Sequence, residues 1–136
     1  MPQRKVDAVL CTSLNLLLRK LCRGAASLLP RLLILDLTNY ELGNIVRKEY
    51  RLGHVKNWES VMERWAKIIG ELPTYSVEVE HLREVEKIAV ERELLFYDAT
   101  YIYVAEKLNL KLITEDEEIL NKCKNSIALD KFLKQS

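Results

Sequence analysis

LFYDATYIYVAEKLNLKLITEDEEIL, residues 95–120, is the stretch that decides the fold. Residues 97–108 carry apolar side chains on almost every side of a helix, which predicts a helix buried nearly all round. Residues 110–114 follow at once and predict a strand covered on both faces. Acids stand at both ends of this unit: Asp98 begins the helix, and residues 115–118 are all acidic. Carboxylates beside buried surface are costly unless something pairs with them.

Strands and helices alternate along the rest of the chain in the same way. We predict strands at 4–7, 32–35, 73–79, 110–114 and 126–129, and helices at 10–21, 38–52, 55–69, 82–95, 97–108 and 117–123. Such alternation is typical of a parallel sheet with helices on its faces. The predicted fold class is therefore α/β, an α/β/α sandwich around a central parallel sheet. A chain of 136 residues with 49% hydrophobic content predicts a single domain over residues 1–136.

Composition excludes few functions. The chain has 21 basic and 20 acidic residues, so its net charge of +1 neither demands nor excludes a nucleic-acid partner. Three cysteines without CxxC spacing predict reduced thiols rather than a disulfide framework. Asp7 and Asn15 interrupt the apolar run near the N-terminus, and basic residues at 19, 20 and 23 follow it, which disfavours a signal peptide. No apolar stretch approaches the roughly 20 residues that a membrane span needs. We expect a cytoplasmic protein with no membrane partner.

The predicted strands place several acids at one edge of the sheet. Ligand sites of parallel sheets form beyond the carboxyl ends of the strands. Asp7 ends the predicted first strand, Glu41 lies one turn into the helix after the second strand, and Asp116 follows the strand at 110–114. We expect these three at the same edge. Asp98 begins the helix before that last strand and could join them.

Each acid also has a simpler explanation as a helix cap. Thr38-x-x-Glu41 and Thr114-x-x-Glu117 match the capping box, in which a hydroxyl and a carboxylate each accept from a backbone amide. Asp98 is a plausible N-cap, because a carboxylate is stabilised at the start of a helix. Taken one at a time, these acids favour capping over a ligand site.

Taken together, the acids favour a cation site. If Glu117 completes the second capping box, Asp116 has no capping role. Asp98 begins a buried helix, so its carboxylate is expected close to the interior. Converging carboxylates repel one another unless a divalent cation neutralises them, and all-oxygen ligands suit Mg²⁺ or Mn²⁺. The sequence has no HExxH, GxGxxG or Walker pattern to indicate another chemistry.

Three segments carry a family resemblance. LILDLTNYELGNIVRKE at 33–49, residues 94–120 and, less clearly, KVDAVL at 5–10 resemble PIN-domain proteins, and more narrowly the archaeal VapC-type toxins of toxin–antitoxin pairs. The resemblance implies an α/β/α sandwich with a Mg²⁺ or Mn²⁺ site. Its four acids, both metal ligands and catalytic residues, would be Asp7, Glu41, Asp98 and Asp116.

The same resemblance implies a function and partners. It implies an endoribonuclease that cuts single-stranded RNA, a small VapB-like antitoxin protein that blocks the cleft, and a homodimer. Arg47, Lys48 and Arg51 could meet the RNA backbone, or could simply be solvated. Two alternatives stay open: a metal-free PIN-like module that binds RNA or protein, and a PIN nuclease in RNA processing. Ala8 and Val9, where the family usually has a polar residue after the first acid, support the metal-free alternative.

Overall fold

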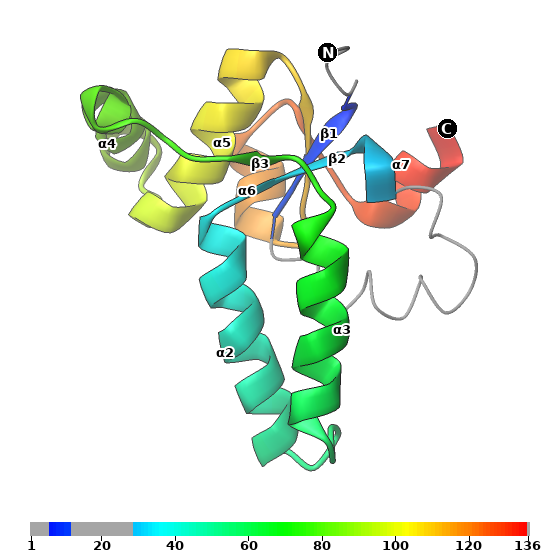
Figure 1. Ribbon diagram of the computed structural model, residues 1–136. Coiled ribbons are helices and arrows are strands. Elements are labelled where there is room, and N and C mark those ends of the chain that lie inside the picture. Colours follow the sequence, from blue (N-terminus) through cyan, green and yellow to red (C-terminus); the bar gives the residue numbers. More distant parts are fainter. Residues whose placement is uncertain (1–5, 12–28, 136) are drawn as a thin grey trace.

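Five parallel strands form the centre of the structure, a computed structural model that describes residues 6–11 and 29–135 (Figure 1). Their order across the sheet is β3-β2-β1-β4-β5, so β1 is the central strand. Every neighbouring pair is parallel, and all carboxyl ends therefore lie at one edge. The strands are β1 Ala8–Leu10, β2 Leu32–Leu35, β3 Thr74–Tyr75, β4 Lys111–Ile113 and β5 Ser126–Ile127.

Helices cover both faces of the sheet. They are α2 Leu37–Arg51, α3 Trp58–Gly70, α4 Leu82–Arg92, α5 Phe96–Leu108, α6 Glu117–Lys122 and α7 Leu129–Gln135, with a 3₁₀ helix, η2, at Val79–His81. Alternate side chains of a strand point to opposite faces. Val9 accordingly packs with residues of α4, α5 and α6, whereas Ala8 and Leu10 pack with residues of α2, α3 and α7. The predicted α/β/α sandwich with a central parallel sheet is confirmed.

The buried helix predicted near the middle of the quoted stretch is α5. Residues 101–105 and Ala99 are all buried in it, which agrees with apolar side chains on nearly every side. α5 runs from the carboxyl edge of the sheet to the amino edge, and β4 returns from there. The helix therefore carries its first turn, with Asp98, to the edge where β4 ends.

The first strand differs from the prediction. β1 spans Ala8–Leu10, which are buried apolar residues, and Asp7 precedes it. The prediction that the first strand ends at Asp7 is therefore wrong, because Asp7 lies before β1; residues 4 and 5 of the predicted strand lie outside the described residues. Leu10 belongs to β1 rather than to the predicted helix at 10–21. The rest of that helix, residues 12–21, falls on a part of the chain that the structure does not describe.

The last helix, α7, was not predicted from the sequence. Residues 126–129 were predicted as a strand, but β5 has two residues and α7 begins at Leu129. Leu129 and Phe132 are buried, and Leu133 packs beside them. The spacing of these three residues, i, i+3 and i+4, is the helical signal that would have identified α7. Within the described residues, no helix is both long and apolar enough to cross a membrane.

The core around α5 can be tested with two matched substitutions. Val104 on α5 is fully buried, and Val90 on α4 is 69% exposed. Val104→Ala should lower the free energy of unfolding by roughly 2 kcal/mol, because it removes buried methyl groups and leaves a cavity. Val90→Ala should change it by less than about 0.5 kcal/mol. Urea unfolding would measure both, and equal losses would contradict the described packing of α5.

Candidate functional site

Glu41 reaches the carboxyl edge of the sheet on the helix that follows β2. Asp36 caps this helix, and its carboxylate accepts a hydrogen bond of 2.9 Å from the first helical amide. The capping box predicted for Thr38 and Glu41 is therefore wrong. The Thr38 hydroxyl is buried and accepts instead from the backbone amide of Leu35 at 3.3 Å. Both side chains are left for contacts away from their own helix.

Tyr101 on α5 provides that contact. Its hydroxyl donates a hydrogen bond of 2.5 Å to Oε1 of Glu41. Burial raises the pKa of Glu41, the hydrogen bond from Tyr101 opposes that rise, and the charge of Asp98 adds to it. The pKa of Tyr101 is raised by burial and by its bond to Glu41, so the phenol keeps its proton. Sequence reasoning did not identify Tyr101, because its position in an apolar helix gives no sign of its polar partner.

Asp98 lies in the first turn of α5 rather than at its cap. The N-cap is Leu95, which makes no side-chain capping bond, so the capping role predicted for Asp98 is wrong. Burial raises the pKa of Asp98, and the charges of Asp116 and Glu118 raise it further. Since the charge of Asp98 also acts on Glu41, the three acids are electrostatic neighbours, although their carboxylate oxygens do not all lie within 4.8 Å of one another.

Asp116 is the N-cap of α6, a role that we predicted for Thr114 and Glu117. One oxygen, Oδ1, accepts from the amides of Glu118 at 2.8 Å and Ile119 at 3.2 Å, which begins α6. The Asp116 amide donates to the buried hydroxyl of Thr114 at 3.1 Å. The capping box predicted for Thr114 and Glu117 is therefore wrong, as is the expectation that Asp116 caps nothing. The cap orients Asp116 and uses only one of its oxygens.

Asp7 lies at the opposite edge of the sheet. It precedes β1, its amide donates to the carbonyl of Arg31 at 2.8 Å, and its carboxylate pairs with the guanidinium of the same arginine. The residue that follows β1 at the carboxyl edge is Cys11, which is buried and donates its amide to Ile113 at 2.9 Å. The position expected for the first acid therefore holds a thiol.

The three converging acids fit a hard divalent cation by donor type. They offer carboxylate oxygens only, which suit Mg²⁺ or Mn²⁺. Glu41 and Asp116 each have one oxygen held by a described hydrogen bond, which leaves Oε2 of Glu41 and Oδ2 of Asp116 as donors. The raised pKa values of Glu41 and Asp98 indicate that their surroundings destabilise the negatively charged carboxylates, and a bound cation would reduce this destabilisation.

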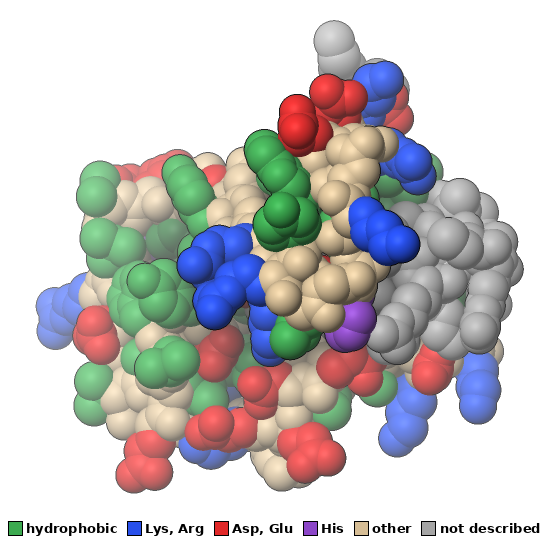
Figure 2. Space-filling view, turned by 90° about the horizontal axis from the view of Figure 1, so that it is seen from below, with side chains coloured by type: hydrophobic (Ala, Val, Ile, Leu, Met, Phe, Trp, Pro, Cys, Tyr) green, Lys and Arg blue, Asp and Glu red, His purple; other side chains and the backbone are tan. Residues whose placement is uncertain are grey.

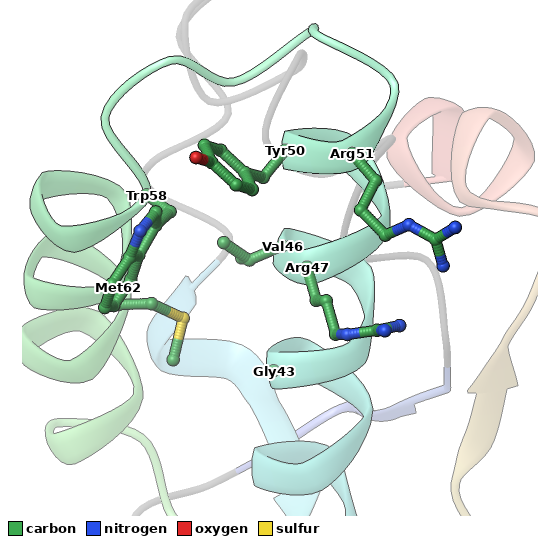
Figure 3. Close-up of a pocket in the computed structure, with 7 residues that line it drawn as sticks. All are labelled: Gly43, Val46, Arg47, Tyr50, Arg51, Trp58 and Met62. Carbon is green, nitrogen blue, oxygen red and sulfur yellow. The ribbon is translucent and has the colours of Figure 1, made fainter.

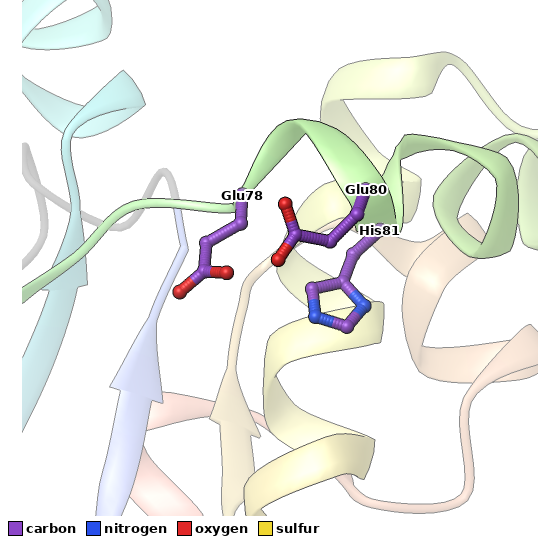
Figure 4. A group of neighbouring side chains, drawn as sticks. All are labelled: Glu78, Glu80 and His81. Atoms are coloured by element: carbon purple, nitrogen blue, oxygen red, sulfur yellow. The ribbon is translucent and has the colours of Figure 1, made fainter.

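A second acidic group lies elsewhere. It consists of three residues on and just before η2: Glu78, Glu80 and His81 (Figure 4). Within residues 6–11 and 29–135, it is the only group of three or more His, Cys, Asp or Glu residues whose possible metal-ligand atoms all lie within 4.8 Å of one another. Nζ of Lys107 lies 3.4 Å from Nε2 of His81, and this ammonium would repel a cation. Lys107 is nine residues beyond Asp98 on α5, about 14 Å along the helix axis. This group is therefore separate from the predicted acids.

A groove of about 490 Å³ separates the outer parts of α2 and α3 (Figure 3). It is lined by Gly43, Val46, Arg47, Tyr50, Arg51, Trp58 and Met62, and none of the predicted acids reaches it. Trp58 is 47% exposed here, whereas Trp65, one heptad later, is a core residue. On the face seen in Figure 2, acidic and basic side chains both occur, in keeping with the balanced composition.

Comparison with known proteins gives consistent results. A family model described as PIN domain matches residues 14–125. Exonuclease VapC9 of Pyrobaculum aerophilum is 44% identical over 103 residues, which cover 76% of this chain and 75% of the relative. Ribonuclease VapC3 of the same organism is 31% identical over 100 residues, 72% of this chain and 76% of the relative. The crystal structure of PAE2754, also from P. aerophilum, superposes with a TM-score of 0.83 at 36% identity and covers 96% of both chains.

The raised pKa of Glu41 predicts how stability depends on pH. A carboxyl group whose pKa is higher in the folded protein stabilises the fold only while protonated, so stability is lost as pH rises through that pKa. Without divalent ions, Glu41→Gln should therefore be more stable than the wild type at pH 7. We expect about 1 kcal/mol at most, given solvent screening, and no difference below about pH 4.

Urea unfolding in EDTA at several pH values measures this difference. Glu63→Gln, on an exposed part of α3, is the matched control and should change stability by less than about 0.5 kcal/mol. If the wild type is more stable than Glu41→Gln at pH 7, the folded protein stabilises the charged form of Glu41, and the prediction from its raised pKa is wrong.

Proposed function

The chain belongs to the PIN-domain family, and we propose that it is a divalent-metal-dependent endoribonuclease that cuts single-stranded RNA. We further propose that it is the toxin of a VapBC-type pair, because two relatives carry VapC names and one of them is called a ribonuclease. The observation that supports the proposal most is that the charge of Asp98 interacts with those of Glu41 and Asp116 at the carboxyl edge of the sheet.

The proposed catalytic and metal-binding residues are these three acids. A bound Mg²⁺ or Mn²⁺ would supply activation of water at neutral pH and stabilisation of charge on the phosphodiester. Glu41 and Asp98 would bind the cation from α2 and α5, and Asp116 would bind it from the start of α6. We leave out Asp7, because it pairs with Arg31 at the amino edge. Thr114 would act indirectly, through the amide of Asp116 that it holds.

The proposal includes protein partners. The VapC names of the relatives support a small VapB-like antitoxin as the partner, and we keep the homodimer expected from the family as part of the proposal. Charged residues of both signs on the visible face neither demand nor exclude an RNA partner. Arg47 and Arg51 could hold RNA phosphates or an acidic segment of the antitoxin beside the α2–α3 groove.

A second candidate function is exonuclease activity. The relative at 44% identity is called an exonuclease, whereas the family resemblance implied an endonuclease. Both activities hydrolyse a phosphodiester and would use the same acids. They differ in whether the enzyme needs a free end of the RNA strand, so circular RNA separates them.

The nuclease proposal predicts which acids are needed. Fluorescent single-stranded RNA is incubated with the wild type, Asp98→Asn, Asp116→Asn and Asp7→Asn, each with Mg²⁺, Mn²⁺ or EDTA. We expect metal-dependent cutting that falls roughly hundredfold or more in Asp98→Asn and Asp116→Asn. Asp7→Asn should keep the wild-type rate, because Asp7 lies at the other edge. If Asp7→Asn is folded yet as inactive as Asp98→Asn, the placement of the site is wrong.

The form of the RNA decides between the two activities. Cutting of circular and linear RNA at similar rates is expected of an endoribonuclease. Cutting of linear RNA alone would replace this proposal by an exonuclease that uses the same acids. If folded wild-type protein cuts neither RNA with either metal, the metal-free binding module becomes the better account.

A further inference from the structure

A chain of hydrogen bonds, buried except at its part-buried end on Glu41, leads there from the backbone of β2. The amide of Leu35 donates to Oγ1 of Thr38 at 3.3 Å, Oγ1 of Thr38 lies 3.1 Å from the hydroxyl of Tyr101, and that hydroxyl donates to Oε1 of Glu41 at 2.5 Å. Thr38 is 2% exposed and Tyr101 is 1% exposed. The chain thus joins β2, α2 and α5 through atoms that water hardly reaches.

When Glu41 is ionised, only one assignment of donors and acceptors satisfies this series of hydrogen bonds. An ionised carboxylate can only accept, so the single hydroxyl proton of Tyr101 is committed to Glu41. The Tyr101 oxygen must then accept from Thr38, whose own oxygen accepts from the Leu35 amide. Each hydroxyl is both donor and acceptor, and bonds in such a chain strengthen one another. Glu41 is therefore held from outside its own helix by Tyr101, 60 residues away, which is in turn linked through Thr38 to the backbone of β2.

We infer that Tyr101 is a positioning residue for Glu41: its hydroxyl holds Oε1 and leaves Oε2 as the oxygen that binds the divalent cation. The inference rests on the proposed function only for the cation. Partners that orient a metal ligand typically contribute 10- to 100-fold to metal affinity. Phenylalanine would fill the same buried space, so packing alone does not account for the hydroxyl at this position.

The test removes single hydroxyl groups and measures Mn²⁺ binding. Isothermal titration of the full chain with MnCl₂ is compared for the wild type, Tyr101→Phe and Tyr103→Phe. Tyr101→Phe should bind Mn²⁺ about 10- to 100-fold more weakly. Tyr103→Phe is the matched control, because Tyr103 is a buried tyrosine of the same helix whose ring lies near Lys107. It should bind within about twofold of the wild type.

Thr38 provides a conservative rescue. Thr38→Val keeps the shape but removes the hydroxyl that donates to Tyr101, so its Mn²⁺ affinity should fall by a smaller factor than in Tyr101→Phe. Thr38→Ser retains the hydroxyl and should bind like the wild type. A purely structural role would lower thermal stability in these variants, and circular dichroism identifies the temperature at which all are folded. Affinity measured there isolates positioning from folding.

The outcomes separate this inference from the proposed function. Folded Tyr101→Phe that binds Mn²⁺ as tightly as the wild type overturns the inference. Weaker binding supports it even if the wild type cuts no RNA, in which case the proposed function alone fails. If the wild type binds no Mn²⁺, the proposed metal site fails. Crystal structures of the metal-free wild type and Tyr101→Phe then decide the positioning role: an unmoved Glu41 carboxylate refutes it, and a displaced one supports it.

Discussion

The cost of partly burying neighbouring carboxylates at one edge of a parallel sheet is the constraint on which the rest of this structure depends. Burial and neighbouring acids raise the pKa values of Glu41 and Asp98, so their charged forms weaken the fold. The apolar core must supply the opposing free energy, since native proteins have a small net stability. Helix α5 serves both needs, because its middle is fully buried while its first turn carries Asp98.

Secondary structure on both sides of the central strand supplies the acids. The β2–α2 connection brings Glu41, and the unit formed by α5, β4 and α6 brings Asp98 and Asp116. Two of the three have one carboxylate oxygen held in place: Tyr101 holds Oε1 of Glu41, and the first amides of α6 hold Oδ1 of Asp116. The proposed site is thus built on regular elements rather than on a long loop, which favours a fixed geometry.

The sequence was sufficient for the fold class and for the edge at which Glu41 and Asp116 lie, because both follow from alternating strands and helices. It was insufficient for Asp7, since a three-residue strand can shift by a few positions without breaking any pattern. Hydrogen-bond roles were also beyond it. Thr38 fits a local capping box in sequence, yet its hydroxyl bonds to Tyr101, 63 residues away, and only the folded chain brings the two together.

A crystal of the protein soaked in MnCl₂, with anomalous scattering measured for manganese, tests the central claim most directly. We predict one or more manganese peaks in contact with oxygens of Glu41, Asp98 and Asp116. Manganese bound at Glu78, Glu80 and His81 while the three acids stay empty would contradict it. Absence of any peak at the carboxyl edge, at a manganese concentration that supports cutting, would contradict it equally.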